Sequence, residues 1–182
     1  MTGFLIRGDQ GKFRDALNLS QATGMDANDA LAAVRRYRSS PGASLNLEQQ
    51  VSDSVGIFAR AGFADGAVEP WDFTDVDRSV SGGVSLRGTS WGRPDDTVGV
   101  AGVLNGITKT HQEWLNVGGT GILVGDGQLP KYGPEKIIET YYSFAVMPAV
   151  KLSADYQFIA DPAYDAQRGP VSILAGRAHA EF

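Results

Sequence analysis

Residues 170–182 (PVSILAGRAHAEF) alternate between two kinds of side chain. One register holds Leu174, Gly176, Ala178, Ala180 and Phe182. The other holds Arg177, His179 and Glu181 and turns apolar at Ala175, Ile173 and Val171. A period of two predicts a β-strand with two different environments. Such a strand faces core and water in a soluble sandwich, but lipid and a wet lumen in a transmembrane barrel. The aromatic residue at the end of the apolar register favours the barrel.

Similar alternation recurs along the chain and predicts further strands. The predicted strands cover approximately residues 2–8, 43–50, 54–64, 78–88, 97–105, 136–146, 149–159 and 171–182. The connections at residues 50–54 and 147–149 are short, whereas residues 65–77, 106–135 and 160–170 form long ones. Alternating short turns and long loops are typical of an outer-membrane barrel.

Two segments between the predicted strands have helical character. Residues 26–38 (DANDALAAVRRYR) have high helix propensity with Asp26 at their start, and residues 111–117 predict a short helix. Neither segment is long enough to form a separate domain. Because no repeat or low-complexity linker divides the chain, we expect residues 1–182 to form a single domain.

The composition narrows the class of protein. The chain is 42% hydrophobic and 20% charged, and no stretch approaches the roughly 18 consecutive apolar residues of a membrane-spanning helix. If the protein lies in a membrane, it therefore crosses as strands. A net charge of -5 argues against a nucleic-acid partner, and the absence of cysteine excludes disulfides and thiolate ligands. The 23 glycines fit a curved sheet better than a flat one.

Most of the aromatic residues lie near predicted strand ends. The set is Trp71, Phe73, Trp91, Tyr132, Tyr141, Tyr142, Tyr156 and Phe182. At these positions they could form an aromatic girdle at the bilayer interface. The alternative is that they are ordinary core and loop residues.

Five segments cover most of the chain in a recognisable order. They are residues 35–50 (RRYRSSPGASLNLEQQ), 56–86, 91–107, 121–142 (GILVGDGQLPKYGPEKIIETYY) and 155–182. Together they resemble the C-terminal part of the carbohydrate-selective porin family, the OprB-type porins of Gram-negative outer membranes.

The resemblance implies an all-β fold, an antiparallel transmembrane β-barrel. The chain would supply about eight strands, the C-terminal half of a barrel of about 16. The implied function is passive diffusion of carbohydrates through a polar, charge-lined lumen, with no catalysis and no cofactor. Implied partners are carbohydrate solutes, outer-membrane lipid, the outer-membrane assembly machinery and further copies in a homo-oligomer. The expected location is the outer membrane, although the residues after Met1 show no signal peptide.

The strand registers select candidate residues for the lumen. These are Glu48, Arg60, Arg87, Glu139, Asp155, Arg177, His179 and Glu181. Such groups can exchange hydrogen bonds with sugar hydroxyls, and opposite charges would order lumen water. The alternative is that they only solvate the wall and form salt bridges within it. The resemblance makes Phe182 the expected anchor at the membrane interface and the signal for barrel assembly.

Other chemistry has weaker support in the sequence. Residues 93–96 and the carboxylates of Asp72, Asp75 and Asp77 suggest calcium, but their spacing is not that of an EF-hand, so we expect solvated loop residues. The glycines of residues 118–127 are not followed by Gly-Lys-Ser/Thr. Neither His111 nor His179 accompanies a recognisable nucleophile motif, so we expect no enzyme.

Two alternatives to a sugar channel stay open at this point. Eight strands could close into a small barrel whose interior is filled by side chains, with a structural or adhesive role. The chain could also be a soluble lectin-like β-sandwich. The exposed faces separate these possibilities, because a membrane barrel has an apolar exterior and a polar interior.

Overall fold

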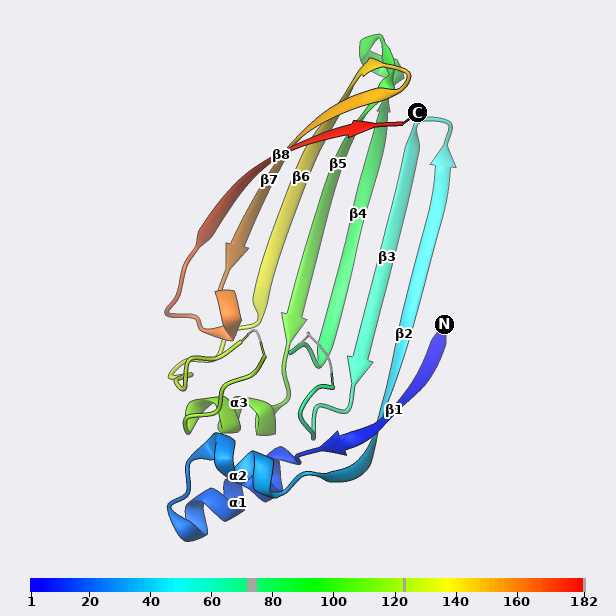
Figure 1. Cartoon of the computed structure of the whole chain (residues 1–182). Helices are drawn as coiled ribbons and strands as arrows, with labels where there is room; N and C mark the ends of the chain where they lie inside the picture. Colours follow the sequence, from blue (N-terminus) through cyan, green and yellow to red (C-terminus); the bar gives the residue numbers. More distant parts are fainter. Residues whose placement is uncertain (72–74, 123, 182) are drawn as a thin grey trace.

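The strands form one antiparallel sheet in the computed structural model, which describes residues 1–71, 75–122 and 124–181. The strands are β1 (Thr2–Gln10), β2 (Arg36–Ser52), β3 (Val55–Ala64), β4 (Arg78–Gly88), β5 (Arg93–Gly106), β6 (Glu135–Met147), β7 (Val150–Ala160) and β8 (Val171–Ala180). Their order in the sheet is their order along the chain (Figure 1). The predicted antiparallel all-β fold is therefore confirmed.

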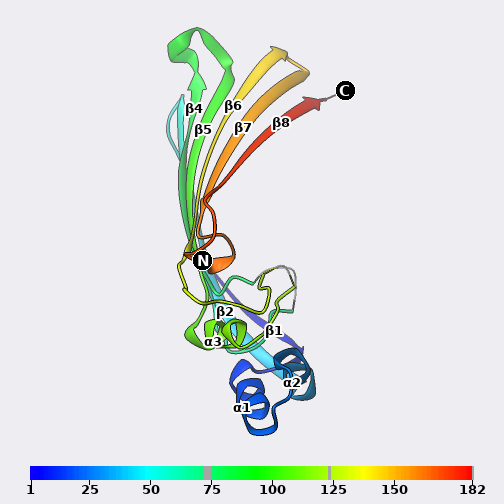
Figure 2. The ribbon, with the colours of Figure 1, turned by 90° about the vertical axis from the view of Figure 1, so that its left-hand side faces the viewer.

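The sheet is open and curved. Strands β1 and β8 are its edges, and no ladder joins them within the described part of the chain. Figure 2 shows the strands as a bent wall seen from the side. Closure into a barrel, and the contribution of half of a larger one, stay predictions.

The two ends of the sheet differ in their connections. At one end, called here the helix end, lie α1 (Phe13–Thr23), α2 (Ala27–Ala33), α3 (Lys109–Asn116), the 3-10 helix η2 (Pro162–Tyr164) and the long loops (Figure 1). At the other, the turn end, strands are joined by residues 53–54, by the 3-10 helix η1 (Thr89–Trp91), and by residues 148–149. The predicted alternation of short and long connections is confirmed.

The start of β2 differs from the sequence prediction. The helix expected over residues 26–38 ends at Ala33, and it begins where the Asp26 carboxylate accepts hydrogen bonds from the Asn28 and Asp29 amides. From Arg36 onward the backbone pairs with β1 instead. The helix assignment was therefore wrong for residues 36–38, because cross-strand pairing outweighs a local helix propensity that is worth only fractions of a kcal/mol per residue.

Helix α1 was not predicted from the sequence. It buries Phe13 and Ala16 and ends at Gly24, whose φ of 72° is the left-handed conformation that glycine adopts most easily. The spacing of its apolar residues and the terminal glycine are the signals that could have identified it. Among the described residues, no helix combines the length and hydropathy needed to cross a bilayer.

The buried apolar core lies at the helix end. Its members are Phe13, Ala16, Ala27, Ala30, Leu31, Ile107, Trp114, Leu115, Leu129 and Tyr164. The Phe13 ring stacks on His111 at 4.4 Å between centroids and contacts Trp114 at 4.9 Å. None of these residues belongs to a strand. A soluble sandwich would instead bury an apolar layer between two sheets, so this arrangement argues against one.

A compact polar cluster lies at the turn end. Asp96 is 1% exposed, and its carboxylate accepts hydrogen bonds from Arg93 (2.5 and 3.1 Å), the Tyr142 hydroxyl (2.5 Å) and the Ala145 amide (2.9 Å). The Arg93 guanidinium also lies 4.0 Å from the centroid of the Phe144 ring. Each carboxylate oxygen thus has two donors, which is the condition for burying a charge without a large penalty.

Replacing Phe13 with alanine tests whether the helix end has its own core. We expect Phe13→Ala to destabilise α1, α2 and α3 by about 3–5 kcal/mol, because it leaves a cavity beside His111 and Trp114. Amide hydrogen exchange of the protein in detergent measures this loss. Phe63→Ala, at a half-exposed position of β3, should not affect exchange in the helices. Uniformly faster exchange in the strands would contradict a separate core.

Replacing Asp96 with alanine tests the cluster at the turn end. We expect Asp96→Ala to lower the urea concentration at the unfolding midpoint, because it leaves the Arg93 guanidinium and the Ala145 amide without their shared acceptor. The neighbouring Asp95 is exposed, so Asp95→Ala should change stability by no more than about 0.5 kcal/mol. Equal effects at the two positions would contradict a structural role for the buried carboxylate.

Candidate functional site: the polar face of the sheet

Cross-strand pairing sorts the side chains of the sheet onto two faces. Ala61 in β3 lies opposite Leu45 in β2 and Val80 in β4, and Val80 lies opposite Leu104 in β5. We call this the apolar face. Its exposed large side chains are Leu5, Leu45, Leu47, Ile57, Phe63, Val80, Leu86, Val100, Leu104, Ile138, Phe144, Leu152, Tyr156 and Leu174. A surface so rich in exposed apolar side chains marks contact with lipid or another protein.

The opposite face, called here the polar face, carries the predicted lumen residues. Phe58 lies opposite Glu48 and Gly83, Gly83 lies opposite Ala101, and Ala101 lies opposite Glu139. The same registers place all of the predicted strand residues on this face: Glu48, Arg60, Arg87, Glu139, Asp155, Arg177 and His179. Their role as a lumen lining stays a prediction.

The remaining two predicted residues follow β8. Glu181 donates its backbone N–H to the Ala149 carbonyl (2.9 Å), and its carboxylate lies 3.0 Å from Nε2 of His179. This contact places the Glu181 side chain beside that of His179. The predicted anchor Phe182 lies outside the described residues, so its position at a membrane interface stays a prediction.

The charged groups of the polar face differ in their contacts. Arg60 binds the Glu48 carboxylate at 2.8 Å and the Asn46 side-chain oxygen at 3.0 Å. Neither Arg87 nor Arg177 makes a hydrogen bond or an ion pair with a described side chain. Arg60 is therefore fixed within the wall, whereas the guanidinium groups of Arg87 and Arg177 can donate to a solute.

Several strand glycines make room for aromatic rings on the polar face. A Cβ at Gly83 would overlap the Phe58 ring, one at Gly99 would overlap Tyr141, and one at Gly42 would overlap Phe4. Each glycine is the cross-strand partner of the aromatic residue that covers it. The abundance of glycine thus has a second cause besides the expected curvature of the sheet, namely close packing of rings on the backbone.

Two pockets adjoin on the polar face. One of about 230 Å³ is lined by Phe58, Ser85, Glu139 and Tyr141, among others. The other, about 420 Å³, is lined by Glu48, Arg60, Arg87 and again by Phe58 and Ser85. Phe58 and Ser85 were not identified from the sequence as site residues. The sequence signal that could have identified them is the strand alternation, which places Phe58 and Ser85 on the same face as the predicted charged residues.

The aromatic residues of the predicted girdle lie in different places, and their position at a bilayer interface stays a prediction. Tyr142 and Tyr156 lie on the apolar face, and the Trp91 indole donates to the Tyr142 hydroxyl at 3.3 Å. Tyr141 lies on the polar face instead. Trp71 covers Gly8, and Tyr132 stacks on Tyr164 at the helix end, which supports the alternative of loop packing for these two residues. Phe73 lies outside the described residues.

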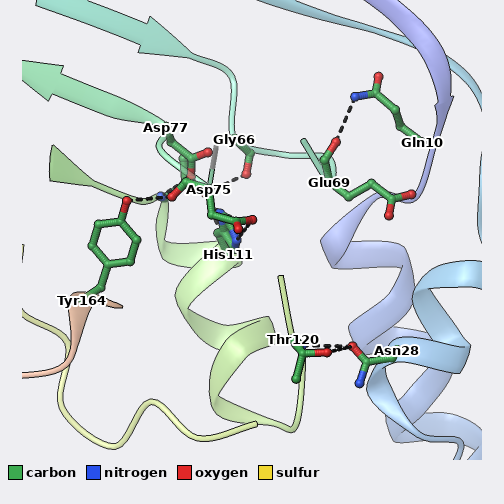
Figure 3. A network of polar contacts seen from close by, with 10 residues as sticks. Gln10, Asn28, Gly66, Glu69, Asp75, Asp77, His111, Thr120 and Tyr164 are labelled. Atoms are coloured by element: carbon green, nitrogen blue, oxygen red, sulfur yellow. Dashed lines mark hydrogen bonds and ion pairs between the residues drawn. The ribbon is translucent and has the colours of Figure 1, made fainter. Parts of the chain in front are cut away.

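A buried polar network joins the loops at the helix end (Figure 3). His111 lies between two aspartates, with Nδ1 3.2 Å from an Asp77 oxygen and Nε2 3.9 Å from an Asp75 oxygen. Asp77 also accepts the Thr108 backbone N–H at 2.6 Å. Tyr164 donates its hydroxyl to the Asp75 carbonyl at 2.7 Å, and burial raises the pKa of this phenol, so it stays a neutral donor.

These contacts correct one expectation from the sequence. Asp75, Asp77 and Asp96 were expected to be solvated loop residues, but they are buried because they serve as acceptors for other parts of the chain. No group of potential metal ligands is present among the described residues, and Asp72 lies outside them. In the glycine-rich loop, Gly119 lies against Trp114, so close packing explains it without a phosphate.

A larger pocket of about 560 Å³ also lies at the helix end. Its lining includes Arg35, Glu69, Trp71 and Trp114, and the Arg35 guanidinium binds the Glu69 carboxylate at 2.7 Å. This ion pair was not predicted from the sequence, because its members come from separate loops. The pocket lies at the end of the sheet opposite the short turns.

Comparisons with known proteins agree with this geometry. The model of the family described as "Carbohydrate-selective porin, OprB family" matches residues 1–182. No curated protein sequence matches the chain significantly. Among solved structures, the chain is similar to one titled "High pH structure of Pseudomonas putida OprB", with 19% identity and a TM-score of 0.72, over 97% of this chain and 42% of that chain.

The two matches carry different weight. At 19% identity the structural likeness shows the fold, and the chain spans less than half the length of that protein. The family match covers the whole length of this chain, residues 1–182, and therefore shows the family. The chain belongs to the carbohydrate-selective porin, OprB family.

Proposed function

We propose that this chain forms part of the wall of an outer-membrane channel through which carbohydrates diffuse passively. In this arrangement the apolar face contacts lipid and the polar face lines the lumen. The solutes move down their concentration gradient, so neither a cofactor nor a covalent step is required.

The opposite polarity of the two faces is the observation that carries the proposal. Large apolar side chains are exposed on one face, for example Val80 at 60% and Ile138 at 57%, while Glu48, Arg60 and Glu139 occupy the other. A soluble protein would bury such an apolar face, whereas an outer-membrane barrel directs it toward lipid. The charged groups opposite would then face water and solute.

The open edges indicate how the channel is completed. In lipid, the unpaired backbone groups of β1 and β8 would each cost several kcal/mol. The similar solved chain is more than twice as long as the part matched here. We infer that β1 and β8 pair with further strands of the same polypeptide to close a barrel of about 16 strands. Recognition by the assembly machinery and a homo-oligomeric state stay predictions.

Conductance tests the channel directly. We expect the protein, purified in the form the cell makes, to conduct ions in planar bilayers and to let liposomes swell in solutions of monosaccharides. Added sugar should reduce the ionic current, because solute and ions share one lumen. Folded protein that inserts without conducting or permitting swelling would overturn the channel, and protein-free liposomes serve as the control.

Adjacent isoleucines in β6 test the orientation of the two faces. Ile138 lies on the apolar face and Ile137 on the polar face. We expect Ile138→Arg to destabilise the protein in lipid vesicles by about 2–4 kcal/mol, because it places a charge in hydrocarbon. Ile137→Arg should cost less, because its charge reaches water. Urea titration measures both, and a larger penalty at Ile137 would reverse the proposed orientation.

A further inference from the structure

The apolar face carries two arginines without a charged partner. Arg7 follows Leu5 by two residues in β1, and Arg78 begins β4 directly opposite Phe63, so both lie among apolar side chains. Both arginines are exposed. Neither makes a hydrogen bond or an ion pair with a described side chain, including Asp9, which shares the register of Arg7. A charge on a surface suited to lipid is costly unless water or an anion receives it.

The other cations at the apolar face are compensated within the chain. Lys136 in β6 forms an ion pair with Asp161 at the helix end. At the turn end, Arg93 binds the buried Asp96. In the described strands, uncompensated positive charge on the apolar face therefore lies only toward the helix end. The two ends of this face differ in the headgroup charge that would suit them.

An aromatic ring accompanies each unpaired arginine. The Arg7 guanidinium lies 5.6 Å from the centroid of the Tyr37 ring, and that of Arg78 lies 5.8 Å from the centroid of Phe63. Both rings are themselves exposed, at 71% and 50%. Contact with the face of a ring restrains a guanidinium without using its N–H donors. Each pair thus presents a planar set of donors beside apolar surface, an arrangement that suits a phosphate attached to hydrocarbon.

The connections of the sheet give these arginines a level in the membrane. Strand β1 ends and β4 begins at the helix end, beside the long loops (Figure 1). In outer-membrane barrels the long loops lie outside the cell and the short turns lie in the periplasm. In the proposed orientation, the two arginines would therefore meet the headgroups of the outer leaflet, where a charge on the lipid side costs least.

We propose that Arg7 and Arg78 are two separate contact points for the phosphate groups of an anionic lipid in the outer leaflet. Each guanidinium donates to phosphate oxygens, while acyl chains lie along neighbouring apolar side chains such as Leu5 and Val80. This inference rests on the proposed placement of the apolar face against lipid. It adds the class of headgroup that the outer surface of the wall recognises.

Binding of a phosphorylated lipid tests the contact. The probes are lipid A, a glycolipid with phosphate groups, and dephosphorylated lipid A, which keeps the sugars and acyl chains. We expect the protein, purified in detergent in the form the cell makes, to bind lipid A more tightly, as measured by titration calorimetry. Excess inorganic phosphate should not displace lipid A, because it lacks acyl chains. Equal affinity for the two lipids, or displacement by inorganic phosphate, would overturn the proposal.

Single substitutions assign the contact to the two arginines. Arg7→Gln and Arg78→Gln should each weaken binding of lipid A by about fivefold, the effect of one basic residue near a membrane surface. Arg78→Lys keeps the charge and should lose less affinity. Arg87→Gln removes a guanidinium from the polar face and should leave the affinity for lipid A unchanged. Folded Gln variants of Arg7 and Arg78 that bind lipid A like wild type would count against the contact, as would an equal loss at Arg87.

The results distinguish this contact from the channel itself. A protein that conducts and admits sugar, but whose binding of lipid A does not depend on Arg7 or Arg78, would overturn the lipid contact alone. Absence of conductance and swelling, together with arginine-dependent binding of lipid A, would overturn the channel and support the lipid contact. The comparison of the two lipids needs only the wild-type protein, so it decides the proposal even if a variant does not fold.

Discussion

The register in which adjacent antiparallel strands pair determines which side chains share a face, and backbone hydrogen bonds between the strands hold that register. A shift of one residue would exchange the two faces, placing Arg60 among the exposed apolar side chains and Ile57 among the charges. The polar face, its pockets and the proposed orientation in lipid all follow from that single geometric condition.

Departures from simple alternation are compensated within the structure. Asp96 lies in the same register as Val98 on the apolar face, but Arg93, Tyr142 and the Ala145 amide satisfy its carboxylate completely. Glycines inside the strands would weaken an ordinary sheet. Here Gly83 and Gly99 leave room for the aromatic rings of Phe58 and Tyr141 from the neighbouring strands. The glycines weaken the strands locally, but they allow these rings to lie against the backbone on the polar face.

The helix end is stabilised by different forces from the strands. The strands of the sheet are joined mainly by backbone hydrogen bonds, whereas the loops pack around Phe13, Trp114 and the buried His111. Buried polar contacts, such as that between His111 and Asp77, are directional and so restrict how the loops can pack. The helix end can therefore keep its shape at one mouth of the proposed channel without support from lipid.

The sequence by itself determined the strands and the faces of their charged residues, because alternation with a period of two is a local property of the chain. It also carried the family resemblance. Only the tertiary structure decided that Arg36 begins a strand rather than extending a helix, since that depends on pairing with β1. The tertiary structure also decided the burial of Asp77 and the position of the Tyr141 ring over Gly99. In both cases the contacting residues are far apart in the sequence, so a local pattern cannot predict the contact.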